Sequence, residues 1–272
     1  QSPRKNRVVT LVNSFHGRTV TTLAATGQEE FHRWFFPFTE GFDYVPANDL
    51  MAAEKAVTED TCAVFVELVQ GEGGMFLLED DYVKGLRELC TRKNVLLMVD
   101  EVQTGVGRTG KFYSYQHFGI QPDVVTSAKG LGGGLPIGAC LCSEALADVL
   151  NGGMHGSTFG GNPVVCAGAL EVLRRVNDPA FLQRVEENGA YFREKLAAIP
   201  GVENVRGLGL MNGADVSPSL GKTAGDVANA CLAEGLLILT AHGALRFLPP
   251  LVITKEEIDE GLEKLKAALQ KQ

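Results

Sequence analysis

Two residues with complementary chemistry follow neighbouring strands that the sequence predicts. Asp100 comes directly after the apolar run 95–99, and Lys129 lies just beyond a second run at 124–127. Because open α/β sheets place ligands at the carboxyl ends of their strands, both side chains are expected at one sheet edge. Such a pair usually forms an ordinary salt bridge. A cofactor with a basic ring nitrogen and an aldehyde would instead use the acid to keep the nitrogen protonated and the lysine to form a Schiff base.

That use of an acid and a lysine is the recurring arrangement of pyridoxal phosphate enzymes. Glycines after Lys129, in AKGLGGGLPIG, let the backbone pass close to a ring without a Cβ in the way. Nucleotide binding is an alternative, because DEVQTGVGRTG at 100–110 contains a literal GxGxxG. A dinucleotide site needs a helix that begins within the glycines, and the segment after Gly110 has no helical period. The lysine of AKGLGGG precedes its glycines, so the stretch is not a Walker A loop.

Composition and charge restrict the class of protein. The 272 residues are 45% hydrophobic and 21% charged, with a formal net charge of −8, as is typical of soluble globular proteins. No basic run predicts nucleic-acid binding, and no apolar segment is long enough to cross a bilayer. The cysteine spacing predicts no metal site. The six cysteines are expected to be reduced, mostly buried thiols, which favours a cytoplasmic protein.

Strands and helices alternate along the chain, which predicts an α/β fold with a mostly parallel sheet. Strands are expected at 8–12, 63–68, 95–99, 124–127, 139–142, 236–240 and 245–248, with a hairpin over 202–215. Helices are expected at 79–93, 164–176, 180–198, 223–234 and 255–270. The change of pattern after residue 176 predicts a large domain over 1–176 and a smaller C-terminal α/β domain over 177–272.

Six blocks, in this order, resemble the signatures of class III aminotransferases: SFHGRT, QGEGG, DEVQTGVGRTGKF, AKGLGGGLPIGA, HGSTFGGNP and LRFLPPLVIT. The resemblance covers essentially the whole chain and implies the type I pyridoxal phosphate fold. It implies transfer of the terminal amino group of N2-acetylornithine to 2-oxoglutarate, a step of arginine biosynthesis. Ornithine, succinylornithine and 4-aminobutyrate are rival donors. His16 stands where ornithine enzymes tend to carry Trp, which favours the acetylated donor.

The resemblance also implies which residues hold pyridoxal phosphate. Lys129 would carry the aldehyde and move the α-proton, and Asp100 would face the ring nitrogen. Phe15 and Val102 would lie against opposite faces of the ring, and Gln103 would reach the ring hydroxyl. Taken alone, residues such as the last three are more often ordinary packing residues at strand ends.

Further residues are implied to bind the substrate and the phosphate. Arg18 would grip the substrate carboxylate with its bidentate fork, and Ser157 would contact the substrate. Thr158 would reach the phosphate held by a neighbouring subunit, which implies a homodimer with a shared active site. Glu72 and Arg246 resemble a switchable pair. The acid would neutralise the arginine for the amine substrate and move aside for a dicarboxylate.

Other residues of these blocks have no assigned step. Glu101 could be a solvated loop acid, and for His16 a structural role and a ligand contact are equally open. Glu67 ends a strand and is expected close to the cofactor. Leu68 stands where the family usually has proline, which could shift the following loop.

The first residues, QSPRKNRVVTLVNSFHG, include neither an initiating Met nor an apolar targeting segment. The chain is therefore expected to begin inside a larger domain. The family's main phosphate-binding loop, Gly-Thr/Ala-Glu-Ala, is expected upstream of residue 1. A second hypothesis follows, in which residues 1–272 are an inactive or partner-bound fragment that holds the cofactor weakly.

Overall fold

The computed structural model describes residues 5–270, and these form two compact units. The first contains the described residues up to 68, together with residues 78–106 and 113–177. The second contains residues 69–77, residues 107–112 and the chain from residue 178 onward. Two short segments, residues 69–77 and 107–112, therefore belong to the second unit although they lie between parts of the first in the sequence. Sequence periodicity did not predict these two short segments, and a domain division after residue 176 remains a prediction.

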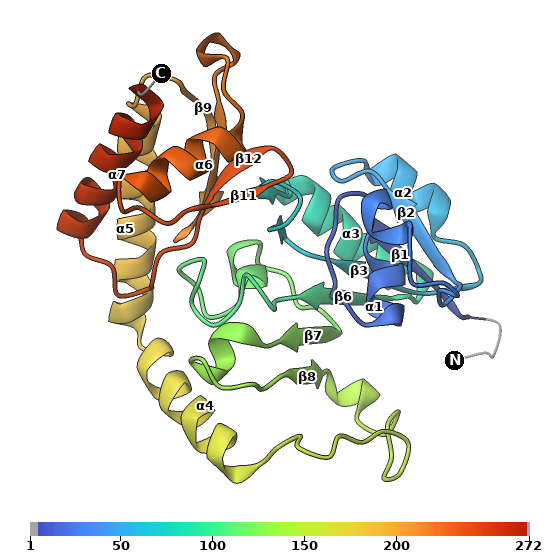
Figure 1. Cartoon of the computed structure of the whole chain (residues 1–272). Helices are drawn as coiled ribbons and strands as arrows, with labels where there is room; N and C mark the ends of the chain where they lie inside the picture. The colour runs from blue at the N-terminus through green and yellow to red at the C-terminus, as the bar shows by residue number, and fades with distance from the viewer. Residues whose placement is uncertain (1–4, 271–272) are drawn as a thin grey trace. The chain divides into compact units, whose positions relative to one another are not determined.

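A six-stranded sheet forms the centre of the first unit, in the order β2-β1-β3-β6-β7-β8 (Figure 1). Its strands are β1 (Arg7–Leu11), β2 (Phe42–Val45), β3 (Thr61–Val66), β6 (Leu96–Asp100), β7 (Val124–Ser127) and β8 (Ala139–Cys142). All neighbours pair in parallel except β7 and β8, which are antiparallel. The predicted α/β fold with a mostly parallel sheet is confirmed.

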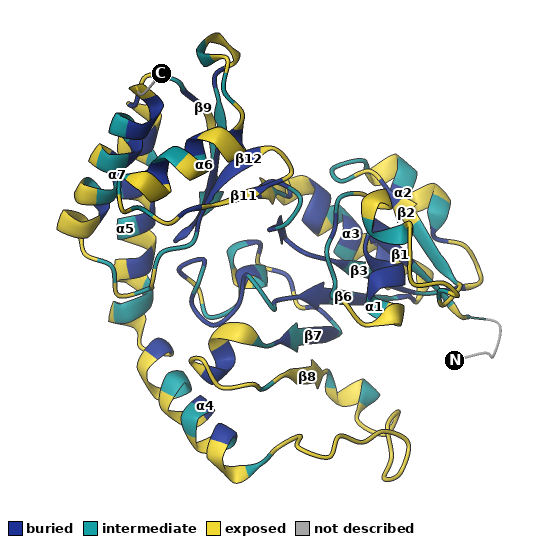
Figure 2. Ribbon diagram, in the orientation of Figure 1, coloured by how far each residue is buried: buried dark blue, intermediate teal, exposed yellow. Residues whose placement is uncertain are grey.

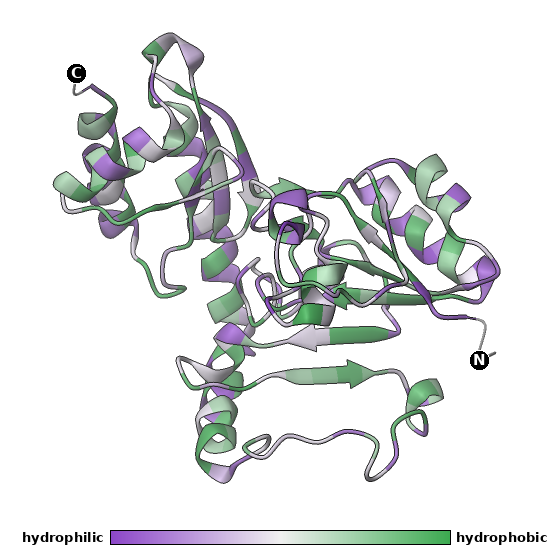
Figure 3. Cartoon of the chain, turned by 45° about the vertical axis from the view of Figure 1, so that its right-hand side comes forward, coloured by the Kyte–Doolittle hydropathy of each residue, from purple (hydrophilic) through white to green (hydrophobic). Residues whose placement is uncertain are grey.

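Apolar residues fill the central strands of this sheet. Val64 on β3 pairs with Leu97 on β6, and all of Val64, Leu97 and Val99 are 1% exposed or less. Figure 2 shows these strands as buried, and Figure 3 shows the apolar character that runs along them. Side chains on both faces of such strands are buried, so their sequences read as continuous apolar runs.

The helix α3 (Asp80–Lys93) connects β3 and β6 and confirms the predicted helix over 79–93. Its buried residues recur at helical spacing: Tyr82, Val83, Leu86, Leu89 and Cys90. Acids stand in its first turn and basic residues in its last turn, where each sign complements the helix dipole. Asn94 ends the helix with a left-handed φ of 52°.

Three elements of the first unit were not predicted from the sequence: α1 (Val20–Ala25), β2 and α2 (Leu50–Ala56). The two helices have six and seven residues, which is less than two turns each, and the four residues of β2 include Asp43 among apolar ones. The long helix α4 (Pro163–Val176) was predicted, and Asn162 caps it by accepting a hydrogen bond from the Val165 amide.

The expectation of mostly buried cysteines is wrong. Only Cys90 and Cys231 are buried, whereas Cys140 and Cys142 are exposed. Both exposed thiols lie on β8, a strand at the edge of the sheet whose four residues are all exposed. The apolar letters around them predicted burial, but an edge strand need not be covered.

The second unit contains a four-stranded antiparallel sheet in the order β11-β12-β10-β9. Its strands are β9 (Val202–Leu208), β10 (Met211–Val216), β11 (Leu239–Ala241) and β12 (Ala244–Phe247). The unit also has a two-stranded ribbon, β4 (Val69–Gln70) with β5 (Phe76–Leu77), and the helices α5 (Pro179–Ala197), α6 (Ala224–Ala233) and α7 (Lys255–Gln270). The predicted hairpin over 202–215 and all three helices are confirmed. Residues 236–238 were predicted as strand, and the strand begins only at Leu239.

One apolar core joins the helices and the sheet of the second unit. Phe192 and Leu196 on α5, Val227 on α6, Leu245 on β12 and Leu265 on α7 belong to the same buried cluster. Within residues 5–270, no helix combines the length and the apolar character that a membrane crossing needs.

Candidate functional site

Four adjacent parallel strands of the first unit lead into residues that the sequence analysis singled out. β1 leads to Phe15, β3 is followed by Glu67, β6 ends at Asp100, and β7 is followed by Lys129. The register pairs Asp100 with Thr126 on the neighbouring strand. The structure therefore brings the carboxyl ends of these strands, and the candidate residues after them, to one edge of the sheet.

The Asp100 carboxylate is buried and held by three contacts. Its Oδ1 accepts hydrogen bonds from the Val102 amide at 3.0 Å and from Thr126 Oγ1 at 3.2 Å. Its Oδ2 lies 2.9 Å from Nδ1 of His16. The side chain is only 6% exposed. A carboxylate has about four acceptor positions, so one, on Oδ2, has no donor among the residues that the structure describes. The donor set fits a group that offers one N–H, such as a protonated ring nitrogen.

Lys129 opens a short 3-10 turn, Lys129–Gly132, and is exposed. Its φ of +46° is left-handed, a conformation that L-residues other than glycine seldom adopt outside functional or tightly constrained positions. Gly133 ends the turn, and a Cβ built there would lie 2.7 Å from Val172 on α4. The glycines of AKGLGGG therefore allow the tight turn after Lys129 and its close approach to α4.

Phe15 and Arg18 form a second cluster near the same edge. The Phe15 amide donates to Glu67 Oε2 at 2.8 Å, and the Phe15 ring contacts Phe31 edge-on at 5.9 Å. The Arg18 guanidinium carbon lies 5.3 Å from the Phe15 ring centre and 4.3 Å from that of Phe31. These cation–π contacts hold the exposed arginine against the two rings. Glu67, to which no step was assigned, therefore positions the Phe15 backbone.

The expectation that Glu101 is a solvated loop acid is wrong, because its side chain is fully buried. Its carboxylate accepts hydrogen bonds from Thr104 Oγ1, from Ser114 Oγ at 2.8 Å and from the Tyr115 amide at 3.0 Å. Burial raises the pKa of the Glu101 carboxyl. Glu101 thus ties the start of the loop that carries Val102 to the segment at 114–115. Val102 and Gln103 themselves are half-buried.

Removing the Glu101 carboxylate should destabilise the protein. Glu101→Ala leaves three buried donors without their acceptor, which should lower the free energy of unfolding by about 3 kcal/mol. Glu101→Gln is the matched control, since its amide oxygen can accept from Ser114 and Tyr115 and its NH₂ can donate to Thr104. Urea unfolding of both variants measures the difference. Equal stability of wild type and Glu101→Ala would contradict the proposed anchor.

The same pair of proteins gives a prediction for pH. A folded-state pKa above the ordinary value of 4.5 means that the folded protein binds this proton more tightly than the unfolded chain does. The stability from this group is present below the unfolded pKa and is lost as pH rises through the folded pKa. Because glutamine does not titrate, Glu101→Gln should gain stability relative to wild type as pH rises above the ordinary value of 4.5. A constant difference over this range would contradict the burial argument.

Ser157 and Thr158 are exposed on the loop between β8 and α4. The structure does not bring either of them into the hydrogen bonds of Asp100. Asn162 follows them as the cap of α4. The two hydroxyls are therefore placed on a surface of the first unit.

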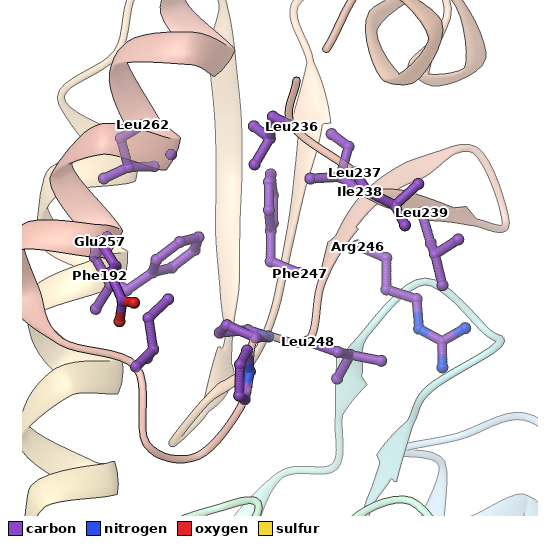
Figure 4. A pocket seen from close by; sticks show the side chains of 15 residues that line it. Phe192, Leu236, Leu237, Ile238, Leu239, Arg246, Phe247, Leu248, Glu257 and Leu262 are labelled. Atoms are coloured by element: carbon purple, nitrogen blue, oxygen red, sulfur yellow. The ribbon is translucent and has the colours of Figure 1, made fainter. Parts of the chain in front are cut away.

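Glu72 and Arg246 form an ion pair within the second unit. Arg246 Nη1 on β12 lies 2.7 Å from Glu72 Oε1, on the turn between β4 and β5. The Arg246 side chain is 9% exposed and that of Glu72 is 32% exposed. Arg246 also lines an apolar cavity of about 350 Å³. Figure 4 shows it there with Leu239 and Leu248. Glu72 is the more exposed partner of this ion pair.

Comparisons with known proteins all find aminotransferases. A family model described as aminotransferase class-III matches residues 1–269. The chain is 48% identical over 266 residues to the acetylornithine aminotransferase of Haemophilus ducreyi, which covers 97% of this chain and 67% of that protein. It is 44% identical over 270 residues to the succinylornithine transaminase of Yersinia pseudotuberculosis, covering 97% of this chain and 65% of that protein.

A solved structure supports the same grouping. The ornithine aminotransferase of Toxoplasma gondii, whose structure has pyridoxal phosphate at partial occupancy in its active site, matches with a TM-score of 0.92. The identity is 37%, and the match covers 99% of this chain and 65% of the other. The chain thus spans about two thirds of the length of these three relatives.

Proposed function

The chain belongs to the class III aminotransferase family, and from this membership and the geometry of the sheet edge we propose a pyridoxal-phosphate-dependent transaminase. Its reaction would move the terminal amino group of N2-acetylornithine to 2-oxoglutarate, giving N-acetylglutamate 5-semialdehyde and glutamate. One observation carries the proposal. The buried Asp100 carboxylate keeps one acceptor position on the strand next to the one that leads to Lys129.

Lys129 provides the amine that would bind the cofactor and then act as a base. Bound pyridoxal phosphate would supply an electron-withdrawing ring that stabilises negative charge on the carbon that carries the amino group. Lys129 Nζ would hold the cofactor at its aldehyde carbon. As a released amine, Nζ is the base that moves the proton of the substrate carbon. Lys129 itself is exposed on its turn.

Asp100 and the residues around it orient the ring. The last acceptor position on Oδ2 would receive the N–H of the ring nitrogen, and a nearby anion favours the protonated form. The Val102 amide and Thr126 hydroxyl fix the carboxylate, so it needs no rearrangement to do this. Phe15 and Val102 would cover the two ring faces, and Gln103 would bind the ring hydroxyl.

Two arginines are proposed to divide the recognition of carboxylates. Arg18, which is exposed and makes cation–π contacts with two rings, binds the carboxylate of each substrate. Arg246 binds the second carboxylate of 2-oxoglutarate after Glu72 has moved aside. With the amine donor, Glu72 returns and neutralises the arginine, so a neutral acetylated chain meets no uncompensated charge.

Arg246→Ala should raise KM for 2-oxoglutarate about 30-fold, since a lost charged hydrogen bond costs about 2 kcal/mol. It should change KM for N2-acetylornithine by less than about 3-fold. Arg18→Ala should raise both KM values, and Glu72→Gln should raise only that of the amine donor. Steady-state kinetics with each substrate varied measures this split. Arg184→Ala, an exposed arginine of the second unit, is the control and should change neither value.

The two KM values moving together in Arg246→Ala would contradict the switch. Small and equal effects of Arg18→Ala and Arg246→Ala would show that neither arginine binds a substrate carboxylate.

A homodimer with a shared site is proposed from Ser157 and Thr158. Both hydroxyls are exposed on their loop, which suits contact with a second copy of the chain. Thr158 would donate to the phosphate held by that copy, and Ser157 would contact substrate. Sedimentation of the protein over a range of concentrations tests the dimer.

The most specific part of the proposal is the identity of the amino donor. The relatives named above act on acetylornithine, succinylornithine and ornithine by their names, and the highest of the three identities is to the acetylornithine enzyme. Measuring kcat/KM for these donors and 4-aminobutyrate, with 2-oxoglutarate as acceptor, decides among them. A higher kcat/KM for any other donor than for N2-acetylornithine would replace the proposed substrate.

A further inference from the structure

His16 lies between the Asp100 carboxylate and an aromatic ring, and its side chain is fully buried. Its Nδ1 is 2.9 Å from Asp100 Oδ2. Its ring stacks on Phe65 of β3, with centres 4.0 Å apart and planes 24° apart. Its backbone amide donates to Thr26 Oγ1 at 2.9 Å. The imidazole is therefore fixed in place and in orientation beside the carboxylate.

The two nitrogens of this imidazole have different surroundings. Nδ1 contacts an acceptor-only carboxylate, so a proton on Nδ1 makes a hydrogen bond. Nε2 is buried and has no hydrogen-bond partner among residues 5–270. A proton on Nε2 would be a buried donor without an acceptor, which is costly, most of all on a charged ring. The surroundings favour the neutral tautomer that carries its proton on Nδ1.

A neutral hydrogen-bond donor beside the Asp100 carboxylate has a different effect from a charged one. A hydrogen bond from His16 orients the carboxylate and stabilises its ionised form. A positively charged imidazolium would instead neutralise the anion and compete with the ring nitrogen of the cofactor for it. Phe15 and His16, adjacent in SFHGRT, thus have separate tasks. Phe15 faces the cofactor ring, and His16 faces the acid that binds the ring nitrogen.

We propose that His16 is a positioning residue that fixes the Asp100 carboxylate through a neutral Nδ1–H, an inference that rests on the proposed function. It acts through Asp100 and does not touch the substrate. Its consequence is that cofactor affinity depends on the donated hydrogen bond, whereas the stability of the protein depends on the stack with Phe65. The two contributions can be separated by substitution.

Two variants make this separation. His16→Phe keeps a flat ring on Phe65 and loses the donor. It should keep Tm near that of wild type and raise the Kd for pyridoxal phosphate about 10-fold or more. His16→Asn places an amide N–H near the position of Nδ1 and loses the stacked ring. It should lower Tm and keep Kd within about 3-fold of wild type. His242→Asn, at an exposed histidine of the second unit, is the control and should change neither.

Nitrogen-15 NMR of the protein without added cofactor tests the tautomer directly. The signal absent from His16→Asn identifies His16. It should show a protonated, pyrrole-type Nδ1 and an unprotonated, pyridine-type Nε2. An imidazolium pattern or a proton on Nε2 would overturn the proposal, and so would unchanged cofactor affinity in His16→Phe.

Parallel loss of Tm and affinity in both variants would also overturn it, because that is the behaviour of a purely structural residue. If His16→Phe does not fold, the NMR pattern of wild type and the affinity of His16→Asn still decide. Failure of the proposed function is distinguishable. In that case Asp100→Ala would bind pyridoxal phosphate as well as wild type does, whatever the tautomer of His16.

Discussion

Replacing Lys129 with alanine is expected to abolish transamination, with kcat lowered by at least about 10⁴-fold. The substitution removes the amine that holds the cofactor and, with it, the base that moves the substrate proton. The fold should persist, since Lys129 is exposed on a short turn and packs into no core. Initial rates at saturating substrates measure the loss, and circular dichroism checks the fold.

The control for this prediction is Lys84→Ala, at an exposed lysine of α3 that pairs with Asp80. It should retain the wild-type rate and the wild-type visible spectrum with pyridoxal phosphate. Turnover of Lys129→Ala within about 10-fold of wild type would exclude Lys129 as the reacting amine.

Asp100→Asn is expected to lower kcat about 100-fold while the protein still folds and binds cofactor. Asparagine has the size of the aspartate but places a neutral amide where the anion was. A fall of two units in the pKa of a ring nitrogen costs about 2.7 kcal/mol of stabilisation of its protonated form, and this corresponds to about 100-fold in rate. Stopped-flow measurement of the half-reaction with amine donor alone isolates this step.

Asp80→Asn, an exposed acid on α3, is the matched control and should react like wild type. If Asp100→Asn also reacts like wild type, Asp100 is an ordinary hydrogen-bonded acid at a strand end. A loss confined to KM would point to substrate binding instead of ring protonation.

Much of the fold could be predicted from the sequence because its long elements have clear periodicity. The bounds of β7, β8 and α7 match the prediction. The helices α3 and α4 differ from it by one residue at one end, and α5 differs by one residue at each end. The helices α1 and α2 were missed because each is shorter than two helical turns, and β2 was missed because Asp43 interrupts its short apolar run. The apolar run 236–238 resembled a strand, but it pairs with no other strand.

Only some contacts of the candidate site could be predicted from the sequence, for a physical reason. Asp100 and Lys129 could be placed because strand ends meet at one edge of a parallel sheet. The contact of His16 with Asp100 joins residues 84 positions apart, so no local pattern could reveal it. Burial of Glu101 was missed because acids in loops are seldom buried. Its three partners become visible only when residues 104 and 114–115 fold around it.

Location of the covalently bound cofactor tests the central claim most directly. Purified protein is titrated with pyridoxal phosphate, followed by visible absorbance, then treated with borohydride and digested for peptide mass spectrometry. The account predicts a saturable visible band and one reduced cofactor adduct, on Lys129, with both absent from Lys129→Ala. An adduct on another lysine, or a band that persists in Lys129→Ala, would contradict it.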